Sequence, residues 1–228
     1  NATPSRWTHQ SKQYVIAPSS HSEQGRLTCI DPVDGRIVWS HTTVAPNHTS
    51  VGISGDILVA KSSLEAAPAS AVGKTDQYTI MAAYRLGLDG PKQIWSLKEQ
   101  GFHWDEETPA LANGHVYAQL NPNTLACIEL ESGKMISREQ VGVGGGDACM
   151  AVMDGRVIVD DDGSHSDTSF HYFDATPAKL RRLGDVWTVP HMSTTAYHPA
   201  LSFPCVDGRL IVRGGNAIYC YDLRKNAE

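Results

Sequence analysis

Histidine, acidic and aromatic side chains gather in the segments that join the β-rich stretches of this sequence. Imidazole and carboxylate groups that converge from separate segments can bind a metal ion or a polar ligand, because each segment supplies one donor at a fixed angle. We expect no metal here; if one binds, its candidate ligands are His103, Asp105 and His198. The predicted ligand-binding residues are His48, His103, Trp104, Asp105, Glu106, Asp147, His191 and His198.

The acidic run at residues 105–107 allows a second kind of chemistry. A carboxylate and an imidazole within reach of a substrate can act as general acid and base. Asp105, Glu106 or Glu107, paired with a histidine at the channel mouth such as His198, would make the chain a hydrolase or a lyase. The same side chains at a water-filled opening would otherwise only be solvated, so no catalytic residue is assigned.

Two other polar segments carry weaker chemical signals. Residues 160–164 resemble part of a calcium loop, but they lack the alternating Asp spacing and the closing Glu of such a loop. We interpret them as a solvated hairpin. The three glycines at 144–146 are not followed by a predicted helix, so they give poor evidence for phosphate binding.

The elements that must position these side chains come from a repeated unit. Residues 27–39 form two short apolar strands joined by an Asp-Gly turn, residues 125–137 repeat this pattern, and residues 218–228 begin it again. Five units align at intervals of 43, 59, 41 and 53 residues, which is the period of a four-stranded propeller blade. No segment shows a helical period. The sequence therefore predicts an all-β fold, a β-propeller of four-stranded antiparallel blades, with about five blades in this chain.

The predicted blades form one domain over residues 1–228. Within each blade the turns between the first and second strands, and between the third and fourth, are short, as in Asn113-Gly114. The other connections are long, and we expect second-to-third loops over 18–24, 62–77 and 161–168. Since long loops lie together on one face, binding is predicted on this loop-rich face and at the channel mouth. The blade boundaries are 5–43, 48–99, 107–141, 148–190 and 199–228.

The segment at residues 29–39 reads Cys-Ile-Asp-Pro-Val-Asp-Gly-Arg-Ile-Val-Trp. It resembles the docking motif of the pyrroloquinoline-quinone-like (PQQ-like) β-propeller repeat family, Ala-x-Asp-x-x-Thr-Gly-Lys-x-x-Trp. Asp31, Gly35 and Trp39 match this motif, whereas its Ala, Thr and Lys are replaced. Propellers of the family have seven or eight blades. The chain is therefore either a fragment of such a propeller or a compact five-bladed ring.

Tryptophans close three of the predicted fourth strands, at Trp39, Trp95 and Trp187. A buried Trp removes about 150–250 Å² from water, and repeats are held together by contacts between neighbours. We therefore predict that these rings dock one blade on the next, together with Gly35 and Gly133 of the tight turns.

Cysteines recur at one position of the unit, as Cys29, Cys127 and Cys220. Stacked sheets lie about 10 Å apart, whereas a disulfide needs Cα atoms within about 7 Å. These thiols should therefore stay unpaired and act as small core residues. The odd total of five cysteines also argues against a disulfide framework.

Composition excludes several classes of function. The net charge is -6 and the basic residues are scattered, so nucleic acid is not an expected partner. No run of about 18 apolar residues is present, so no membrane span is predicted. The chain begins at Asn1 without Met, and we expect a signal peptide that is removed or encoded upstream. An extracytoplasmic location, in the periplasm or at the cell envelope, follows from this expectation.

The resemblance implies a non-catalytic binding or scaffold propeller of the bacterial cell envelope, similar to the repeat lipoproteins that assist outer-membrane assembly. Its expected partner is a protein, a polar small molecule or a glycan, and no cofactor is expected. The alternative is a fragment or relative of a quinone-dependent dehydrogenase with PQQ and calcium, although the adjacent Cys pair typical of those enzymes is missing. The Trp104-Asp105 dipeptide does not recur at blade ends, so WD40 repeats are not predicted.

Overall fold

The computed structural model of the chain describes thirteen segments of it. In these segments the secondary structure is antiparallel β-strand, and no helix is present. No helix in this part of the chain could therefore cross a membrane. The described residues are 3–21, 24–43, 50–65, 77–100, 108–121, 124–140, 150–153, 155–160, 168–175, 179–184, 187–189, 204–214 and 217–224.

Three four-stranded sheets follow one another from the N-terminus, each with its strands in sequence order. The first sheet consists of β1 (Ser5–His9), β2 (Lys12–His21), β3 (Gln24–Ile30) and β4 (Ile37–Thr43). The second consists of β5 (Gly52–Ser54), β6 (Ile57–Glu65), β7 (Gln77–Arg85) and β8 (Lys92–Gln100). The third consists of β9 (Ala110–Ala112), β10 (His115–Asn121), β11 (Thr124–Glu129) and β12 (Met135–Gln140).

The last two sheets do not have four strands each. In the fourth sheet two short strands both pair with β15 and share the place of a single fourth strand. Its strands are β13 (Met150–Met153), β14 (Arg156–Asp160), β15 (Thr168–Asp174), β16 (Arg181–Arg182) and β17 (Trp187–Val189). The fifth sheet has three described strands, β18 (Cys205–Val206), β19 (Arg209–Gly214) and β20 (Ala217–Asp222).

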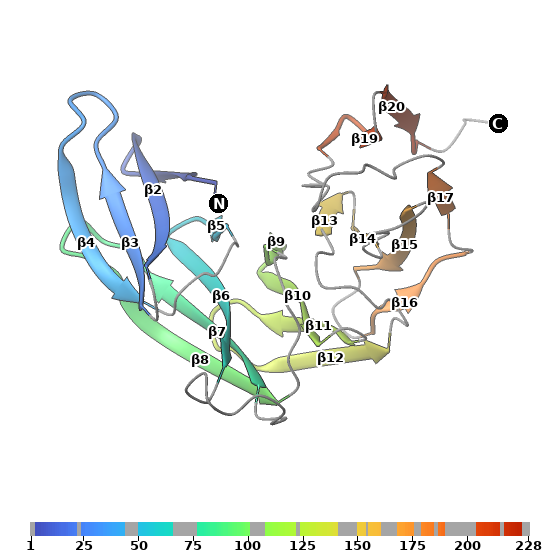
Figure 1. Ribbon diagram of the computed structural model, residues 1–228, viewed down its shortest axis with the longest axis horizontal. Helices are drawn as coiled ribbons and strands as arrows, with labels where there is room; N and C mark the ends of the chain where they lie inside the picture. Colours follow the sequence, from blue (N-terminus) through green and yellow to red (C-terminus); the bar gives the residue numbers. More distant parts are fainter. Residues whose placement is uncertain are drawn as a thin grey trace.

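The five sheets succeed one another around an arc (Figure 1), which confirms the predicted propeller arrangement of blades. The first strands of neighbouring sheets touch, β1 against β5, β5 against β9 and β9 against β13, and the fourth strands β4, β8 and β12 lie at the periphery. The arc stays open between the first and the fifth sheets.

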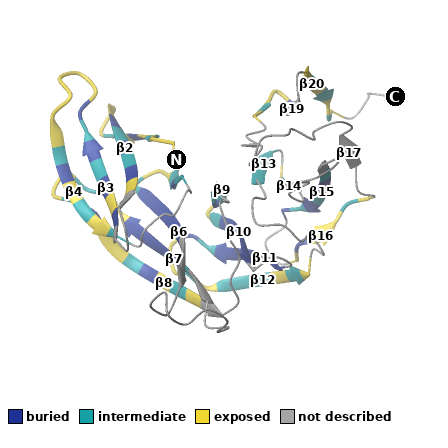
Figure 2. Ribbon diagram, viewed as in Figure 1, coloured by how far each residue is buried: buried dark blue, intermediate teal, exposed yellow. Residues whose placement is uncertain are grey.

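Each pair of neighbouring sheets shares one hydrophobic cluster. In β10, Val116 and Ala118 face the second sheet, whereas Tyr117 between them faces the fourth. Successive side chains of a strand point to opposite faces, so an inner strand supplies two interfaces at once. Figure 2 shows the consequence, since the middle strands β6, β7, β10 and β11 are largely buried and the outer strands β4, β8 and β12 are more exposed.

In four of the sheets an equivalent backbone hydrogen bond closes the end of the sheet that carries the tight turns. The residue after the third strand donates its N–H to the carbonyl of the second residue in the turn between the first two strands. In the first sheet Asp31 makes the turn hydrogen bonds that Glu129 makes in the third, so the residue equivalent to Leu130 is Pro32, which has no N–H to donate. Here Lys12 Nζ instead donates to Asp31 Oδ2 at 2.7 Å. The four bonds run from Leu86 to Asp56, Leu130 to Gly114, Ala175 to Gly155 and Leu223 to Gly208.

The connections between second and third strands are shorter than predicted. Residues 62–65 pair with 77–80 as a continuation of β6 and β7, and β2 continues through Pro18 to His21. Pro18 lies beyond the paired length of β1, which begins with Ser5 opposite Ile16, so the edge of β2 that faces β1 has no partner strand at Pro18 and tolerates a residue without an N–H. These strands reach further than expected towards the loop-rich face.

Candidate functional site

The predicted ligand-binding residues of the loop-rich face all lie outside the residues that the structure describes. The channel-mouth site therefore stays a prediction. Among the described residues, no group of three or more His, Cys, Asp or Glu side chains could hold a metal ion. The residues concerned are His48, His103, Trp104, Asp105, Glu106, Asp147, His191 and His198.

The structure places Trp95 of β8 against the next sheet. Its indole Nε1 donates to the carbonyl of Leu130 at 2.8 Å, and the ring is 8% exposed. The ring covers Gly133, where an added Cβ would come within 2.7 Å of the indole. Gly133 also has a φ of +72°, in the region that favours glycine. A fourth-strand Trp thus lies on the tight turn of its neighbour.

The other predicted docking residues differ from this arrangement. Trp39 is equally buried, but its Nε1 has no hydrogen-bond acceptor among the described residues. Gly35 has a φ of +74°, yet nothing lies within 4 Å of an added Cβ, so this glycine serves its own turn. The loops before the two tryptophan strands are of equal length, 31–36 and 86–91, but the second sheet has the additional register pair Arg85 and Lys92 before Ala83 pairs with Trp95.

Trp187 does not occupy the fourth-strand position of Trp39 and Trp95. Those two residues pair close to the end of the third strand: Trp39 with Cys29, one residue before Ile30, and Trp95 with Ala83, two residues before Arg85. Trp187 pairs with Phe170, which lies four residues before the end of β15 at Asp174. The predicted equivalence of the three tryptophans is therefore wrong for Trp187, because the fourth strand of this sheet is split into β16 and β17.

Two hydrogen bonds to one carboxylate join the first and second sheets at their tight turns. Asp56 Oδ1 accepts hydrogen bonds from Trp7 Nε1 at 2.9 Å and from His9 Nδ1 at 3.0 Å. The bond from His9 is the main cause of a lowered pKa of Asp56. Trp7 is fully buried. This arrangement holds two blades together and leaves no room for a ligand between the three side chains.

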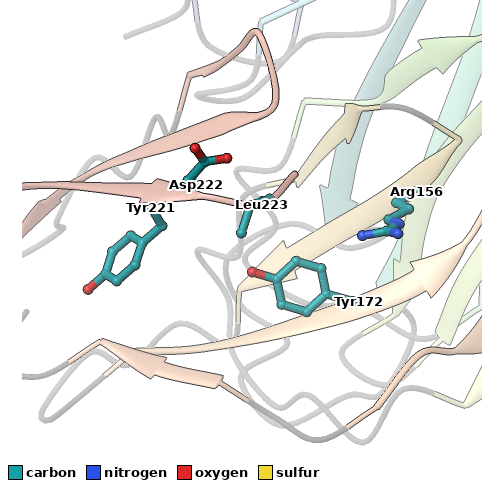
Figure 3. Close-up of a pocket in the computed structure, with 5 residues that line it drawn as sticks. All are labelled: Arg156, Tyr172, Tyr221, Asp222 and Leu223. Carbon is teal, nitrogen blue, oxygen red and sulfur yellow. The ribbon is translucent and has the colours of Figure 1, made fainter. Parts of the chain in front are cut away.

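A concave site lies between the fourth and fifth sheets, near the tight-turn ends of their strands (Figure 3). It has a volume of about 360 Å³. β14 and β15 of the fourth sheet supply one wall, and β20 with the residue after it supplies the other. We call this site the 4–5 groove. It is lined by Arg156, Tyr172, Tyr221, Asp222 and Leu223.

Asp222, the carboxylate that lines the 4–5 groove, forms an ion pair with Arg224 of the same sheet. Arg224 Nε donates to Asp222 Oδ1 at 2.7 Å, and a second guanidinium nitrogen contacts the other oxygen. These bonds lower the pKa of Asp222 to about 2. Burial raises the pKa of Tyr172 to about 12, so its phenol stays neutral. Arg156 forms no ion pair with a described carboxylate, and it is the cation that the groove offers to a ligand.

A second cavity of about 470 Å³ lies between β4 of the first sheet and the pair β7 and β8 of the second. Tyr84 in its wall accepts a hydrogen bond from Thr43 Oγ1 at 2.6 Å and is itself buried. None of its described lining residues is an Asp, Glu, Lys or Arg. Its lining residues are His41, Thr42, Thr43, Ile80, Ala82, Tyr84, Gln93 and Ser96.

Sequence reasoning missed the 4–5 groove. Arg156 and Tyr221 are far apart in the chain and meet only because two sheets pack together. One signal was present, because Tyr219 and Tyr221 alternate along β20 and their rings stack with centroids 6.2 Å apart. Two tyrosines on one face of a strand point to a shared interface, but they do not show which sheet is the neighbour.

Successive antiparallel sheets around an arc, with first strands innermost and one hydrophobic cluster per interface, define a β-propeller. The crystal structure of BamB from Moraxella catarrhalis matches the whole chain with a TM-score of 0.62 at 10% sequence identity. The chain spans 58% of the length of that structure. This likeness supports the β-propeller fold.

A weaker likeness links the chain to an enzyme. A europium-containing methanol dehydrogenase matches 50% of this chain and 23% of its own length, with a TM-score of 0.39 at 12% identity. A likeness this low supports no conclusion about fold or function. No protein-family model matches the chain, and no curated protein is similar to it in sequence.

Proposed function

We propose that the chain is a non-catalytic binding propeller whose blades are scaffold and whose surface holds a partner protein. The observation that carries this proposal is the 4–5 groove, a concave site with Tyr172, Tyr221 and Arg156 in its walls. Tyr and Arg are enriched among the residues that dominate binding energy at protein interfaces. A volume of about 360 Å³ suits one protruding group of a partner.

We further propose an extracytoplasmic location at the cell envelope. Two observations support it: the resemblance of residues 29–39 to the docking motif of PQQ-like propellers, and the likeness of the fold to BamB. The loop-rich face, with its predicted ligand-binding histidines and acidic residues, would then be a second surface for a protein or a polar ligand.

Cross-linking in the native host tests the proposed function. A photoreactive amino acid at Arg209, an exposed residue at the start of β19, would report partners of the 4–5 groove. The same substitution at His103 would report partners of the loop-rich face, and Arg26 on the first sheet is the matched control. We expect one discrete cross-linked protein from Arg209 or His103 and none from Arg26. Cross-links that are absent from both test positions would overturn the proposal.

The dehydrogenase alternative requires PQQ and calcium, so a calorimetric titration separates it from the binding proposal. We expect no saturable heat when the purified chain is titrated with PQQ in the presence of Ca²⁺. Tight binding of one quinone per chain would favour the dehydrogenase instead.

A further inference from the structure

We infer that the 4–5 groove recognises an acidic segment of the partner, with a carboxylate beside an apolar side chain. This inference rests on the proposed function and adds the chemical class of what is bound. The whole chain carries a net charge of -6, so a basic surface on it is not a consequence of overall composition. The charges around the groove have the opposite sign.

Basic residues outnumber acidic ones at the tight-turn ends of the fourth and fifth sheets. Within the described residues this region holds six cations and three carboxylates. Five of the six cations are exposed, and Arg156 is half-buried in the groove. The cations are Arg156, Lys179, Arg181, Arg182, Arg209 and Arg224, and the carboxylates are Asp174, Asp207 and Asp222.

Two of the three carboxylates are already engaged by arginines. Asp222 is held by Arg224 of its own sheet. Asp174 lies 3.9 Å from a guanidinium nitrogen of Arg181 and is the register partner of Arg156 across β14 and β15. Outside these two pairs, the described residues of this region hold four cations and one carboxylate, Asp207, so a positive charge excess remains. A complementary ligand must bring its own negative charge.

The walls of the groove add a shape requirement to this charge requirement. Figure 3 shows Arg156 and Tyr172 of the fourth sheet on one side of the space and Leu223, after β20 of the fifth sheet, on the other, with the Tyr172 ring between the other two side chains. An apolar side chain can contact Leu223 and Tyr172 while a neighbouring carboxylate pairs with Arg156. Guanidinium groups bind carboxylates with two parallel hydrogen bonds, which favours a carboxylate over a neutral polar group.

Fluorescence polarisation with labelled peptides tests this inference. The probe is a six-residue peptide of alternating Glu and Phe, and the comparison peptides replace Glu by Gln or by Lys. We expect saturable binding of the Glu peptide that weakens with salt, and no binding of the Lys peptide. Arg156→Gln should weaken binding of the Glu peptide about tenfold or more, whereas Arg26→Gln on the first sheet should leave it unchanged.

Two outcomes would overturn the inference: equal binding of the three peptides, or unchanged binding by Arg156→Gln. If that variant does not fold, Arg209→Gln provides the same test at an exposed position, with a smaller loss expected. Failure of this inference can be distinguished from failure of the proposed function. A partner cross-linked at Arg209 without binding of the Glu peptide would reject the acidic ligand alone, and peptide binding without any cellular cross-link would reject the proposed function.

Discussion

The indole of Trp95 in the second sheet lies on Gly133 in the third, so close that a Cβ at Gly133 would come within 2.7 Å of the ring. The same Trp donates its Nε1 proton to the carbonyl of Leu130 at 2.8 Å. Packing and hydrogen bonding thus act together at one blade interface. Because each sheet touches only its neighbours, such contacts determine whether successive blades keep their orientation.

Gly133→Ala should destabilise the protein more than Gly35→Ala. Both glycines have a φ above +70°, so both substitutions introduce left-handed backbone strain of about 1–2 kcal/mol. Only Gly133 also faces a ring, and relieving that clash should cost about 1–3 kcal/mol more. Urea unfolding of the two variants measures the difference. In a Trp95→Ala background the two glycine substitutions should cost the same, and a persistent difference would contradict the contact.

Trp95→Phe should cost more than Trp39→Phe, although both rings are 8% exposed. Loss of the Trp95 indole N–H leaves the buried carbonyl of Leu130 without its donor, at about 1–3 kcal/mol. Trp39 Nε1 has no acceptor in the described part of the chain. Trp39→Phe therefore removes a buried N–H without breaking a hydrogen bond, and it should lower the free energy of unfolding less than Trp95→Phe does. Thermal or urea unfolding compares the variants, and equal losses would show that the Trp95 hydrogen bond contributes nothing.

Asp31 should stabilise the fold in a pH-dependent manner. Its hydrogen bond from Lys12, aided by the N–H of Val33, lowers the pKa of the carboxyl in the folded state. The stabilisation is therefore complete above the unfolded pKa of about 3.9 and is lost as the pH falls through the lower folded pKa. The difference in unfolding free energy between the native chain and Asp31→Asn should be constant above pH 5 and shrink below about pH 4. Asp34→Asn, in the same turn, controls for the loss of one charge.

The thiols should differ sharply in reactivity. Burial raises the pKa of Cys29 to about 11 and also raises the pKa of Cys127. Cys220 on β20 is exposed. Iodoacetamide at pH 8 should therefore modify Cys220 rapidly and spare Cys29 and Cys127 until denaturant is added, because the thiolate is the reacting form. Peptide mass spectrometry assigns the sites. Rapid labelling of Cys29 in the folded protein would contradict the packing of the first two sheets.

Local sequence signals predicted the strands and tight turns well, because these elements depend on neighbouring residues. Asn113 and Gly114, for example, have φ values of 50° and 75°, as the two-residue turn of an antiparallel hairpin requires. The third strands were predicted as residues 27–31, 81–85, 125–129, 170–174 and 218–222, and the observed strands cover these residues apart from Asp31.

Features that depend on packing between sheets were not predictable in this way. The split of the fourth strand into β16 and β17 shifted the register of Trp187, although its sequence position matched a fourth-strand end. The 4–5 groove joins Arg156 to Tyr221 across an interface that no short motif describes. The predicted channel-mouth residues lie outside the described residues and stay a prediction.

Hydrogen exchange in the presence of the cross-linked partner, purified and added back, tests the central claim most directly. We expect slower exchange in the segments 156–160, 170–174 and 219–223, which contain the residues that line the 4–5 groove, and unchanged exchange at the tight turn of the first sheet, residues 31–36. Protection confined to the first three sheets, or no protection by a partner that binds, would contradict the assignment of the groove as the binding surface.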